Sequence, residues 1–567
     1  MKTTKRLLSL VMIAVLLLCV FAGCSEKTPG TTTNAPDGTT AGSQGPNLEN
    51  KHKLTILAFN NAGGDWDMNN YQETNVWPAF KAMLDKYGLE LEFEFIEPDQ
   101  YDTVLTTELA GPMKEQADLM WGKTDEVTTL LSADAGRLAA LQDILVYSDG
   151  TAASFFEEHP EYLARSAYNG KNYWFGEYTM ATMGGEYVGL GASSTTGPIL
   201  RQDWLNKLGY TKDNLPDTVD EIEAFVLACQ EQDANGNGVK DEYFNMMLHT
   251  VSAVNTGLNY FYGIPANEFS PNLQTHNVEV FWEQKNVKEY LKKLIDWIDK
   301  DIIAEDMVGD NNKFYTYNSA NQAAALNTYF CDSWSFGNCP VPEGAEPLSI
   351  VGVMPDKTVH PDAHLGRDAT PTMDTVKVLI SADADLEAVA HLMDILYSEE
   401  CSHLMTWGTE GESFAYDENG KEYYINGAEN LANVATNPKA TSMYNVFGRG
   451  ALPSVFAYYP MEGDQACCYT DWQLETHDAS LEWPAVYPNL VAPFYAVATP
   501  AEAEELASLM TDYQTLSDEI YVDILLGRID IDTEWDSKVI KPLEEAGLLR
   551  IKEIRQAQLS RYFAFTE

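Results

Sequence analysis

The spacing of apolar residues predicts strands and helices that alternate from about residue 52. Period-two alternation is typical of strands, and a 3.6-residue spacing is typical of helices. Strand, helix, strand, helix, strand is the order of a doubly wound α/β lobe, in which ligands lie beyond the carboxyl ends of the strands. We therefore expect binding residues at 59–67 (FNNAGGDWD) and 121–126 (WGKTDE). The first five elements are expected at 52–59, 76–88, 89–96, 101–111 and 117–121.

A second series of elements begins near Pro198. This proline is placed to open a helix whose apolar stripe runs from Leu200 to Leu208 and which Gly209 ends. Thr218 and Glu221 form the capping-box pattern of a further helix. The remaining elements are expected to be helices at 218–230, 286–303 and 385–398, strands at 323–330 and 375–381, and helices from about residue 501.

The N-terminus has the pattern of an export signal. Basic residues precede an apolar run from Leu7 to Val20, which is too short and wrongly flanked for a membrane span. The ending FAGC resembles a bacterial lipobox, which implies removal of residues 1–23 and a diacylglyceryl group on Cys24. The alternative is ordinary secretion without a lipid. Residues 25–50, rich in Thr, Gly, Ser and Pro, predict a flexible tether.

Charge excludes some partners. With 86 acidic and 36 basic residues the net charge is −50, and no basic stripe occurs. Because phosphate binding needs clustered Lys and Arg, nucleic acid and anionic membrane surfaces are poor partners. The eight cysteines show no CxxC pair and no metal spacing. About 515 residues follow the tether, enough for two or more domains.

Residues 232–243 (QDANGNGVKDEY) have the spacing of a calcium loop. Counting Asp233 as position 1, oxygen donors fall at positions 3, 5, 7 and 9, with Gly238 at the bend. Phe244 occupies position 12, where a Glu is usual, so Glu242 could supply that carboxylate. The alternative is a surface turn without metal. The candidate metal ligands are Asp233, Asn235, Asn237, the Val239 carbonyl, Asp241 and Glu242.

Aromatic residues are the candidate ligand platforms, since sugar rings pack on aromatic faces while hydroxyl groups bond to polar side chains. The chain has 12 Trp, 30 Tyr and 22 Phe. It has no GxSxG, HExxH or P-loop motif that would favour catalysis. Most Trp residues of a protein are core, so we expect about half of the candidates to touch ligand. The candidate ligand-binding residues are Asn60, Trp66, Asp67, Trp121, Trp174, Glu177, Arg201, Asp332 and Trp334.

The lipobox, the tether, the stretch ILRQDWLNKLG, the loop DANGNGVKDE and the C-terminal LLGRIDIDTEWDSKVIKPLEEAGLLRIKEIRQAQLSRYF together resemble the family 1 extracellular solute-binding lipoproteins of ABC importers. They are most similar to the branch that includes the alginate-oligosaccharide binders. The resemblance implies a two-lobed α/β fold of the periplasmic-binding-protein type II kind, with an interlobe cleft that closes on the ligand. It also implies structural calcium in the loop. Lobe 1 would hold 51–185 and 375–435, and lobe 2 would hold 186–374 and 436–567.

The function predicted from this resemblance is capture of a carbohydrate, specifically an oligosaccharide, for uptake through ABC permease subunits. The protein would be a monomer, lipid-anchored at the extracellular face of the cell membrane, and not an enzyme. One alternative is a binder of peptide or another non-sugar solute. A second is a lipid-anchored polysaccharide-degrading enzyme, and a third is a calcium-stiffened adhesin, which the lack of internal repeats disfavours.

Overall fold

The structure is a computed structural model. The residues that it describes are 52–59, 68–73, 76–97, 99–122, 125–179, 195–251, 258–265, 267–272, 275–329, 350–364, 366–367, 372–412, 414–416, 418, 420, 422–425 and 496–566. The export signal, Cys24 and the tether lie outside these residues, so the predictions made for them stay predictions.

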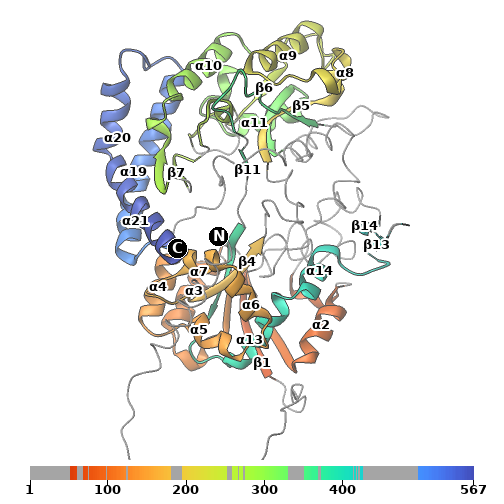
Figure 1. The fold of residues 1–567 in the computed structure, drawn as a ribbon, viewed down its shortest axis with the longest axis vertical. Helices are drawn as coiled ribbons and strands as arrows, with labels where there is room; N and C mark the ends of the chain where they lie inside the picture. Colours follow the sequence, from red (N-terminus) through yellow and green to blue (C-terminus); the bar gives the residue numbers. More distant parts are fainter. Residues whose placement is uncertain are drawn as a thin grey trace, which may run out of the picture. The chain divides into compact units, whose positions relative to one another are not determined.

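The first sheet has the strand order β2–β1–β3–β12–β4. Its strands β1 and β4 are labelled in Figure 1. β1 pairs in parallel with β2 and with β3, whereas β12 runs antiparallel to β3 and β4. The alternation of strands and helices predicted for the start of the chain is therefore confirmed. The strands are β1 His52–Phe59, β2 Leu89–Ile96, β3 Leu119–Gly122, β4 Trp174–Thr179 and β12 Thr372–Ile380.

Successive side chains of these strands enter two different cores. Leu54 and Ile56 pack with helices α2 and α13 on one face, while Leu57 packs with α3 and α4 on the other. Strand β1, which is covered on both faces, accordingly reads as a nearly continuous apolar run. The edge strand β2 instead alternates buried Leu89 and Leu91 with exposed Glu90 and Glu92. The helices around it are α2 Trp77–Lys86, α3 Tyr101–Ala110, α4 Glu126–Asp134, α5 Leu141–Ile144, α6 Thr151–Glu158, α7 Pro160–Ser166, α13 Leu386–Leu396 and α14 Glu399–Trp407.

The second sheet has the order β10–β5–β9–β6, with β11 also paired to β5. β5 runs antiparallel to its neighbours, and β6 runs parallel to β9. Its strands are β5 Thr195–Arg201, β6 Tyr243–Asn245, β9 Ala323–Tyr329, β10 Ile350–Gly352 and β11 Gly366–Arg367. Its helices are α8 Gln202–Lys207, α9 Val219–Gln232, α10 Val287–Asp299 and α11 Asn312–Ser319.

The prediction of a helix that begins at Pro198 is wrong for its first half. Pro198 lies in β5, opposite Asn327 of β9, and its carbonyl accepts the N–H of Val353 at 2.8 Å. Only Gln202–Lys207 is helical. Proline favours the first turn of a helix, but here the pairing of β5 with β9 and β10 decides the structure. These partner strands are distant in the sequence, so the stretch around Pro198 alone does not reveal them.

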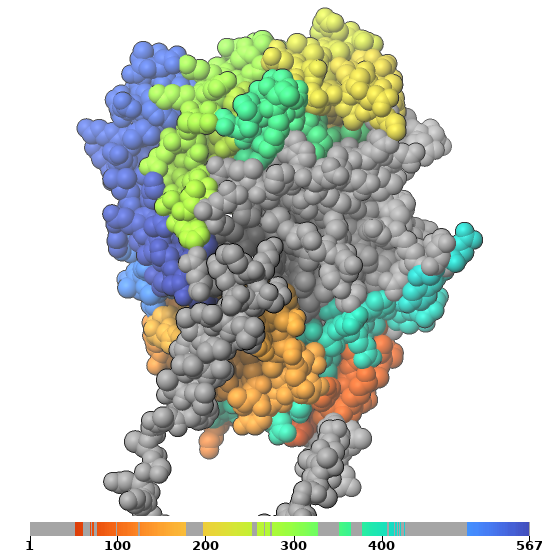
Figure 2. Space-filling model, viewed as in Figure 1, coloured from red at the N-terminus to blue at the C-terminus, as the bar shows by residue number. Residues whose placement is uncertain are grey.

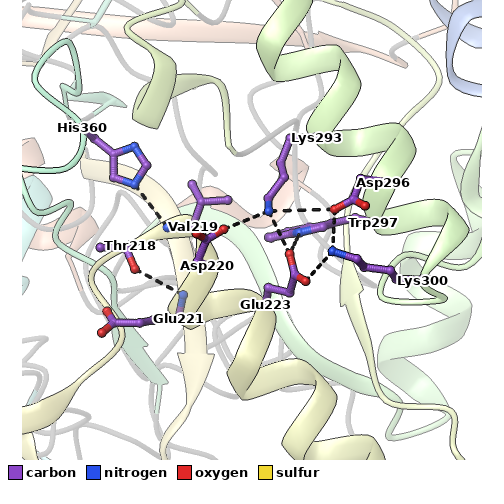
Figure 3. Close-up of polar contacts among 10 residues, drawn as sticks. All are labelled: Thr218, Val219, Asp220, Glu221, Glu223, Lys293, Asp296, Trp297, Lys300 and His360. Atoms are coloured by element: carbon purple, nitrogen blue, oxygen red, sulfur yellow. Dashed lines mark hydrogen bonds and ion pairs between the residues drawn. The ribbon is translucent and has the colours of Figure 1, made fainter.

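Helix α9 begins where the sequence predicts and is tied to α10 (Figure 3). The Thr218 hydroxyl accepts the N–H of Glu221 at 3.2 Å and so caps the first turn. The carboxylate of Glu223 in α9 accepts hydrogen bonds from Lys293 of α10 and from Lys300, which follows the last residue of α10. The same carboxylate accepts the indole N–H of Trp297 at 2.9 Å, so three donors fix the two helices in one register.

The C-terminal helices pack on elements of both sheets. Helix α21 contacts α7 and β8, and α19 contacts α4 and α10. Figure 2 shows these helices, in blue, beside the green segment that carries β7 and β8. The remaining elements are β7 Phe269–Asn272, β8 Asn277–Val280, β13 Phe414–Tyr416, β14 Glu422–Tyr424, α19 Pro500–Leu525, the π-helical turn Trp535–Ile540, α20 Lys541–Glu545 and α21 Leu548–Thr566. In the described part of the chain we find no helix with the length and apolarity needed to cross a membrane.

Candidate functional site

The carboxyl ends of the parallel strands meet at one edge of the first sheet. β4 shares the direction of β3 because both run against β12. The N-terminal half of β12 therefore reaches the same edge, where Lys377 pairs with Gly122 of β3 and Gly176 of β4. This edge is where α/β sheets present binding residues. Residues 60–67, which follow β1, lie outside the described part of the chain.

Lys377 is a buried cation at this edge. It is 7% exposed, and lysine is seldom buried unless it is paired. Its Nζ lies 3.1 Å from Oε1 of Glu126, in the first turn of α4, and 4.8 Å from the centre of the Trp174 ring. The ion pair and the cation–π contact offset the loss of hydration of the ammonium group. The Glu126 carboxylate is partly exposed and so remains accessible to a ligand.

Tyr101 lies against the same edge. Its hydroxyl has no hydrogen-bond partner among the described residues, although the side chain is buried. Burial raises the pKa of Tyr101 above its usual range. A Cβ added at Gly122 would lie 2.5 Å from the Tyr101 ring, so only glycine lets the ring approach β3 this closely. The result is an edge with a buried phenol, a buried ammonium group and a carboxylate.

Two of the candidate tryptophans lie in hydrophobic cores. Trp121 is 2% exposed and packs with the residues of α2 and α13, while Trp174 is 1% exposed and packs with α3 and α4. The indole N–H groups of both have no partner within the described ranges. These positions fit a core role, and Trp121 and Trp174 are therefore not proposed as ligand platforms.

Arg201 is held by its own neighbours at the end of β5. Its guanidinium forms a two-bond ion pair with Asp203, at 3.0 and 2.6 Å, and stacks 3.8 Å from the centre of the Trp204 ring. A third bond reaches Oδ1 of Asn321 at 2.5 Å. This arrangement is that of a structural arginine. Of the other candidates, the Glu177 side chain and all of Asn60, Trp66, Asp67, Asp332 and Trp334 lie outside what the structure describes.

The loop after α9 folds its oxygen-bearing side chains inward. Oδ2 of Asp233 accepts the N–H of Gly238 at 2.9 Å, and Oδ1 of Asn235 accepts the N–H of Asn237 at 3.0 Å. Oδ1 of Asn237 accepts the N–H of Val239 at 2.7 Å. Each bond joins a side chain to a backbone N–H two or five residues later, so the backbone turns tightly. Gly236 and Gly238 adopt φ values of 76° and 81°, which glycine tolerates best.

The carboxylates of Asp241 and Glu242 accept hydrogen bonds from within this loop. Glu242 is fully buried, and its two oxygens accept the N–H groups of Asn235 and Asp241. The Asp241 carboxylate accepts the side-chain amides of Asn235 and Asn237 at 2.8 to 2.9 Å. Oδ1 of Asp233 is buried and has no hydrogen-bond partner in the described structure. A buried, unsatisfied carboxylate oxygen beside further oxygen donors fits a hard cation such as Ca²⁺.

No group of three or more His, Cys, Asp and Glu side chains within the described ranges is arranged as a metal cluster. The predicted calcium set also draws on two amides and a backbone carbonyl. The loop is therefore a candidate, and its ligand set stays a prediction.

Sequence reasoning missed Lys377 and Tyr101, whereas Glu126 is the last residue of the stretch 121–126 in which binding residues were expected. The only local signal was a lysine that interrupts the apolar run of TVKVLIS. That lysine becomes informative only once β12 is seen to lie between β3 and β4, which are far from it in sequence.

No family model matches the chain. Among curated proteins it is similar to the fructooligosaccharide ABC transporter substrate-binding protein FusA of Streptococcus pneumoniae serotype 4 (strain ATCC BAA-334 / TIGR4), with 26% identity over 377 residues. This match covers 64% of the chain and 65% of FusA, so the chain aligns with slightly less than two thirds of that relative's length.

Solved structures resemble the chain over most of its length. An extracellular solute-binding protein from Bifidobacterium longum subsp. infantis superposes with a TM-score of 0.66 and 18% identity, covering 91% of this chain and 99% of that one. FusA in complex with kestose gives a TM-score of 0.62 and 19% identity, with 90% and 99% covered. Alginate-binding protein AlgQ2 without calcium ion gives 0.59 and 14%, with 90% and 99% covered.

These similarities confirm the resemblance inferred from the lipobox, the loop and the C-terminal motif. They also confirm the predicted α/β fold class, in agreement with the sheets described above and the helices around them. The chain has the fold of the extracellular solute-binding proteins that serve ABC transporters.

Proposed function

We propose that this chain is an extracellular solute-binding lipoprotein that captures an oligosaccharide for uptake by an ABC importer. The observation that carries the proposal is the fold, which it shares with solute-binding proteins over about nine tenths of its length. FusA, the curated relative, is a fructooligosaccharide-binding component of such a transporter. Since FusA is named a substrate-binding protein, capture without chemical change is the activity that we assign.

The ligand would bind between the two lobes, against the carboxyl edge of the first sheet. Lys377 and Glu126 offer a donor and an acceptor there, which are the groups that sugar hydroxyls require. In the sequence, Asn60, Trp66 and Asp67 come after β1, and Asp332 and Trp334 come after β9. We propose Trp66 and Trp334 as stacking platforms, because both come soon after a strand end and neither belongs to a strand pattern.

Calcium is proposed as a structural ion of the loop 233–242. The residues that would hold it are Asp233, Asn235, Asn237, the Val239 carbonyl, Asp241 and Glu242. The buried Glu242, the hydrogen-bonded Asp241 carboxylate and the unsatisfied Asp233 oxygen support this assignment. A solved structure of a FusA EF-hand mutant, similar at a TM-score of 0.62 and 18% identity, supports a calcium loop in that relative.

Lipid anchoring at Cys24 is proposed from the sequence of the export signal and the tether. We expect Cys24→Ser to release the protein from the cell envelope into the medium, because serine lacks the thiol that would carry the diacylglyceryl group. Fractionation of cells that express either form measures this. If the variant still sediments with membranes, the lipid anchor is wrong. The expected partners are ABC permease subunits, with the protein itself a monomer.

The function is tested by isothermal titration calorimetry with a panel of kestose, alginate oligosaccharides, human milk oligosaccharides and short peptides. We expect saturable binding of at least one oligosaccharide. Chromatography of the same mixtures should recover the glycan intact. Binding of peptides alone would favour the alternative solute class, and cleavage of a glycan would show that the protein is an enzyme.

A further inference from the structure

The loop 233–242 receives one side chain from outside its own sequence. Nε2 of Gln322 donates a hydrogen bond to Oδ2 of Asp241 at 2.5 Å. Gln322 is separated from Asp241 by 81 positions in the chain and stands directly before β9. It is only partly buried, so its amide is not forced into this position by burial alone.

The backbone of Gln322 is fixed on both sides. Its N–H donates to the Tyr317 carbonyl at 3.0 Å, and its carbonyl accepts the N–H of Tyr243 at 2.7 Å. The preceding residue, Asn321, has a φ of 60° and accepts a hydrogen bond from the buried guanidinium of Arg201. The amide of Gln322 is therefore presented by a rigid turn, and the Arg201 side chain helps to hold that turn.

The other donors to Asp241 belong to the loop and are themselves predicted metal ligands. Asn235 and Asn237 now direct their amide nitrogens at the Asp241 carboxylate. To coordinate a cation these amides must offer their oxygens to the ion, because nitrogen in a carboxamide is not a ligand for Ca²⁺. Asp241 would then lose its intraloop donors, and Gln322 would be the described donor that remains.

We propose that Gln322 is a positioning residue for the metal loop, which holds the Asp241 carboxylate in a coordinating orientation and ties the loop to the start of β9. This inference rests on the calcium assignment made above. Side chains that hydrogen-bond to a ligating carboxylate fix its direction, and their loss usually weakens metal binding 10- to 100-fold.

The variant Gln322→Met removes the donor and keeps the length of the side chain. We expect its dissociation constant for Ca²⁺, measured by calorimetry on the purified full chain after chelation and dialysis, to rise about 10-fold. Gln514→Met is the matched control, because Gln514 is also half-buried and donates to an aspartate, Asp518, at 3.0 Å on α19. The control should bind Ca²⁺ as wild type does.

Affinity and stability separate a positioning role from a merely structural one. If Gln322→Met lowers the melting temperature in EDTA but binds Ca²⁺ as tightly as wild type, Gln322 only braces the turn and the proposal is overturned. If wild type itself gives no heat with Ca²⁺, the calcium assignment is wrong, and this inference is wrong with it. That outcome is distinguishable because it appears in wild type and not only in the variant. A 10-fold loss of affinity in a variant whose circular dichroism matches wild type supports the proposal.

Discussion

At the scale of single residues, the most unusual group is Glu268. It is 2% exposed, and one of its carboxylate oxygens accepts hydrogen bonds from Trp282, Tyr513 and Ser517, at 2.7, 2.7 and 2.6 Å. Burial raises the pKa of Glu268 from 4.5 to about 7, and these donors only partly counter that effect. Tyr513 and Ser517 lie on α19, so this carboxyl group joins α19 to the segment before β7.

The raised pKa predicts a stability that falls with pH. Because the folded state holds this proton more tightly than the unfolded state, the contribution is complete below about pH 4.5 and is lost as the pH rises through about 7. A shift of this size corresponds to roughly 3 kcal/mol. The variant Glu268→Gln stays neutral, so its stability relative to wild type should increase between pH 4.5 and 8, as measured by urea unfolding. Parallel curves for the two proteins would contradict the prediction, and the exposed Glu553→Gln serves as control.

At the scale of elements, helices α9 and α10 depend on one carboxylate. Burial raises the pKa of Glu223, but the hydrogen bonds from Lys293, Lys300 and Trp297 outweigh it and lower the pKa to about 2. Glu223 therefore stays charged over the whole physiological range. Its side chain is 15% exposed, less than that of a typical surface ion pair, so water screens the interaction only in part.

We expect Glu223→Gln to destabilise the protein by about 1 to 2 kcal/mol, because two lysines lose a charged partner and one oxygen acceptor becomes a donor. The loss should be seen as a lower melting temperature near pH 7. It should shrink as the pH falls from about 4.5 through 2, where wild-type Glu223 also takes up a proton. Glu231→Gln, on an exposed position of the same helix, should leave the melting temperature unchanged. Equal melting temperatures for all three proteins at pH 7 would refute this view of the contact.

The metal loop is also an element with its own prediction. If Ca²⁺ binds the folded state alone, it stabilises that state by about 4 kcal/mol when present at a thousand times its dissociation constant. Chelation should then lower the melting temperature by several degrees, and Asp233→Ala should make the protein insensitive to Ca²⁺. Asp213→Ala, an exposed substitution before α9, is the control. Ligand stoichiometry should not change in either variant. An unchanged Ca²⁺ response in Asp233→Ala would show that the ion binds elsewhere.

The sequence predicts an element well when the residues that stabilise it lie within the same segment. The strands β1 and β2 and the start of α9 follow from periodicity and a capping residue within each segment, and they form where predicted. Pro198 misleads because its strand is stabilised by β9 and β10, more than a hundred residues away. Lys377 and Gln322 are similar cases, since each gains its role only from a partner that tertiary folding brings close. Trp121 and Trp174 read as loop aromatics, yet the sheet buries both.

At the scale of the whole molecule, the described part of the chain builds two five-stranded sheets in turn, and later segments then return to both. β12 comes after the second sheet in sequence but completes the first, between β3 and β4. The C-terminal helices contact α4 and α7 as well as α10 and β8. Under the proposed function, a chain that passes between the two sheets several times would form a hinge from more than one segment. The lobe boundaries predicted from the resemblance stay a prediction.

Closure of such a hinge would bring residues that follow β1 and residues that follow β9 toward one ligand. On this basis Trp66→Ala and Trp334→Ala should each weaken oligosaccharide binding by roughly 2 kcal/mol, about thirtyfold, because each removes a stacking face. The quenching of tryptophan fluorescence by the ligand should also shrink in each variant. Trp297→Phe is a suitable control, since Trp297 is fully buried in the second core and should affect stability without changing affinity. If both alanine variants fold and bind a glycan that wild type binds with unchanged affinity, the ligand contacts lie elsewhere on the two lobes, and the polar edge at Lys377 becomes the first place to test.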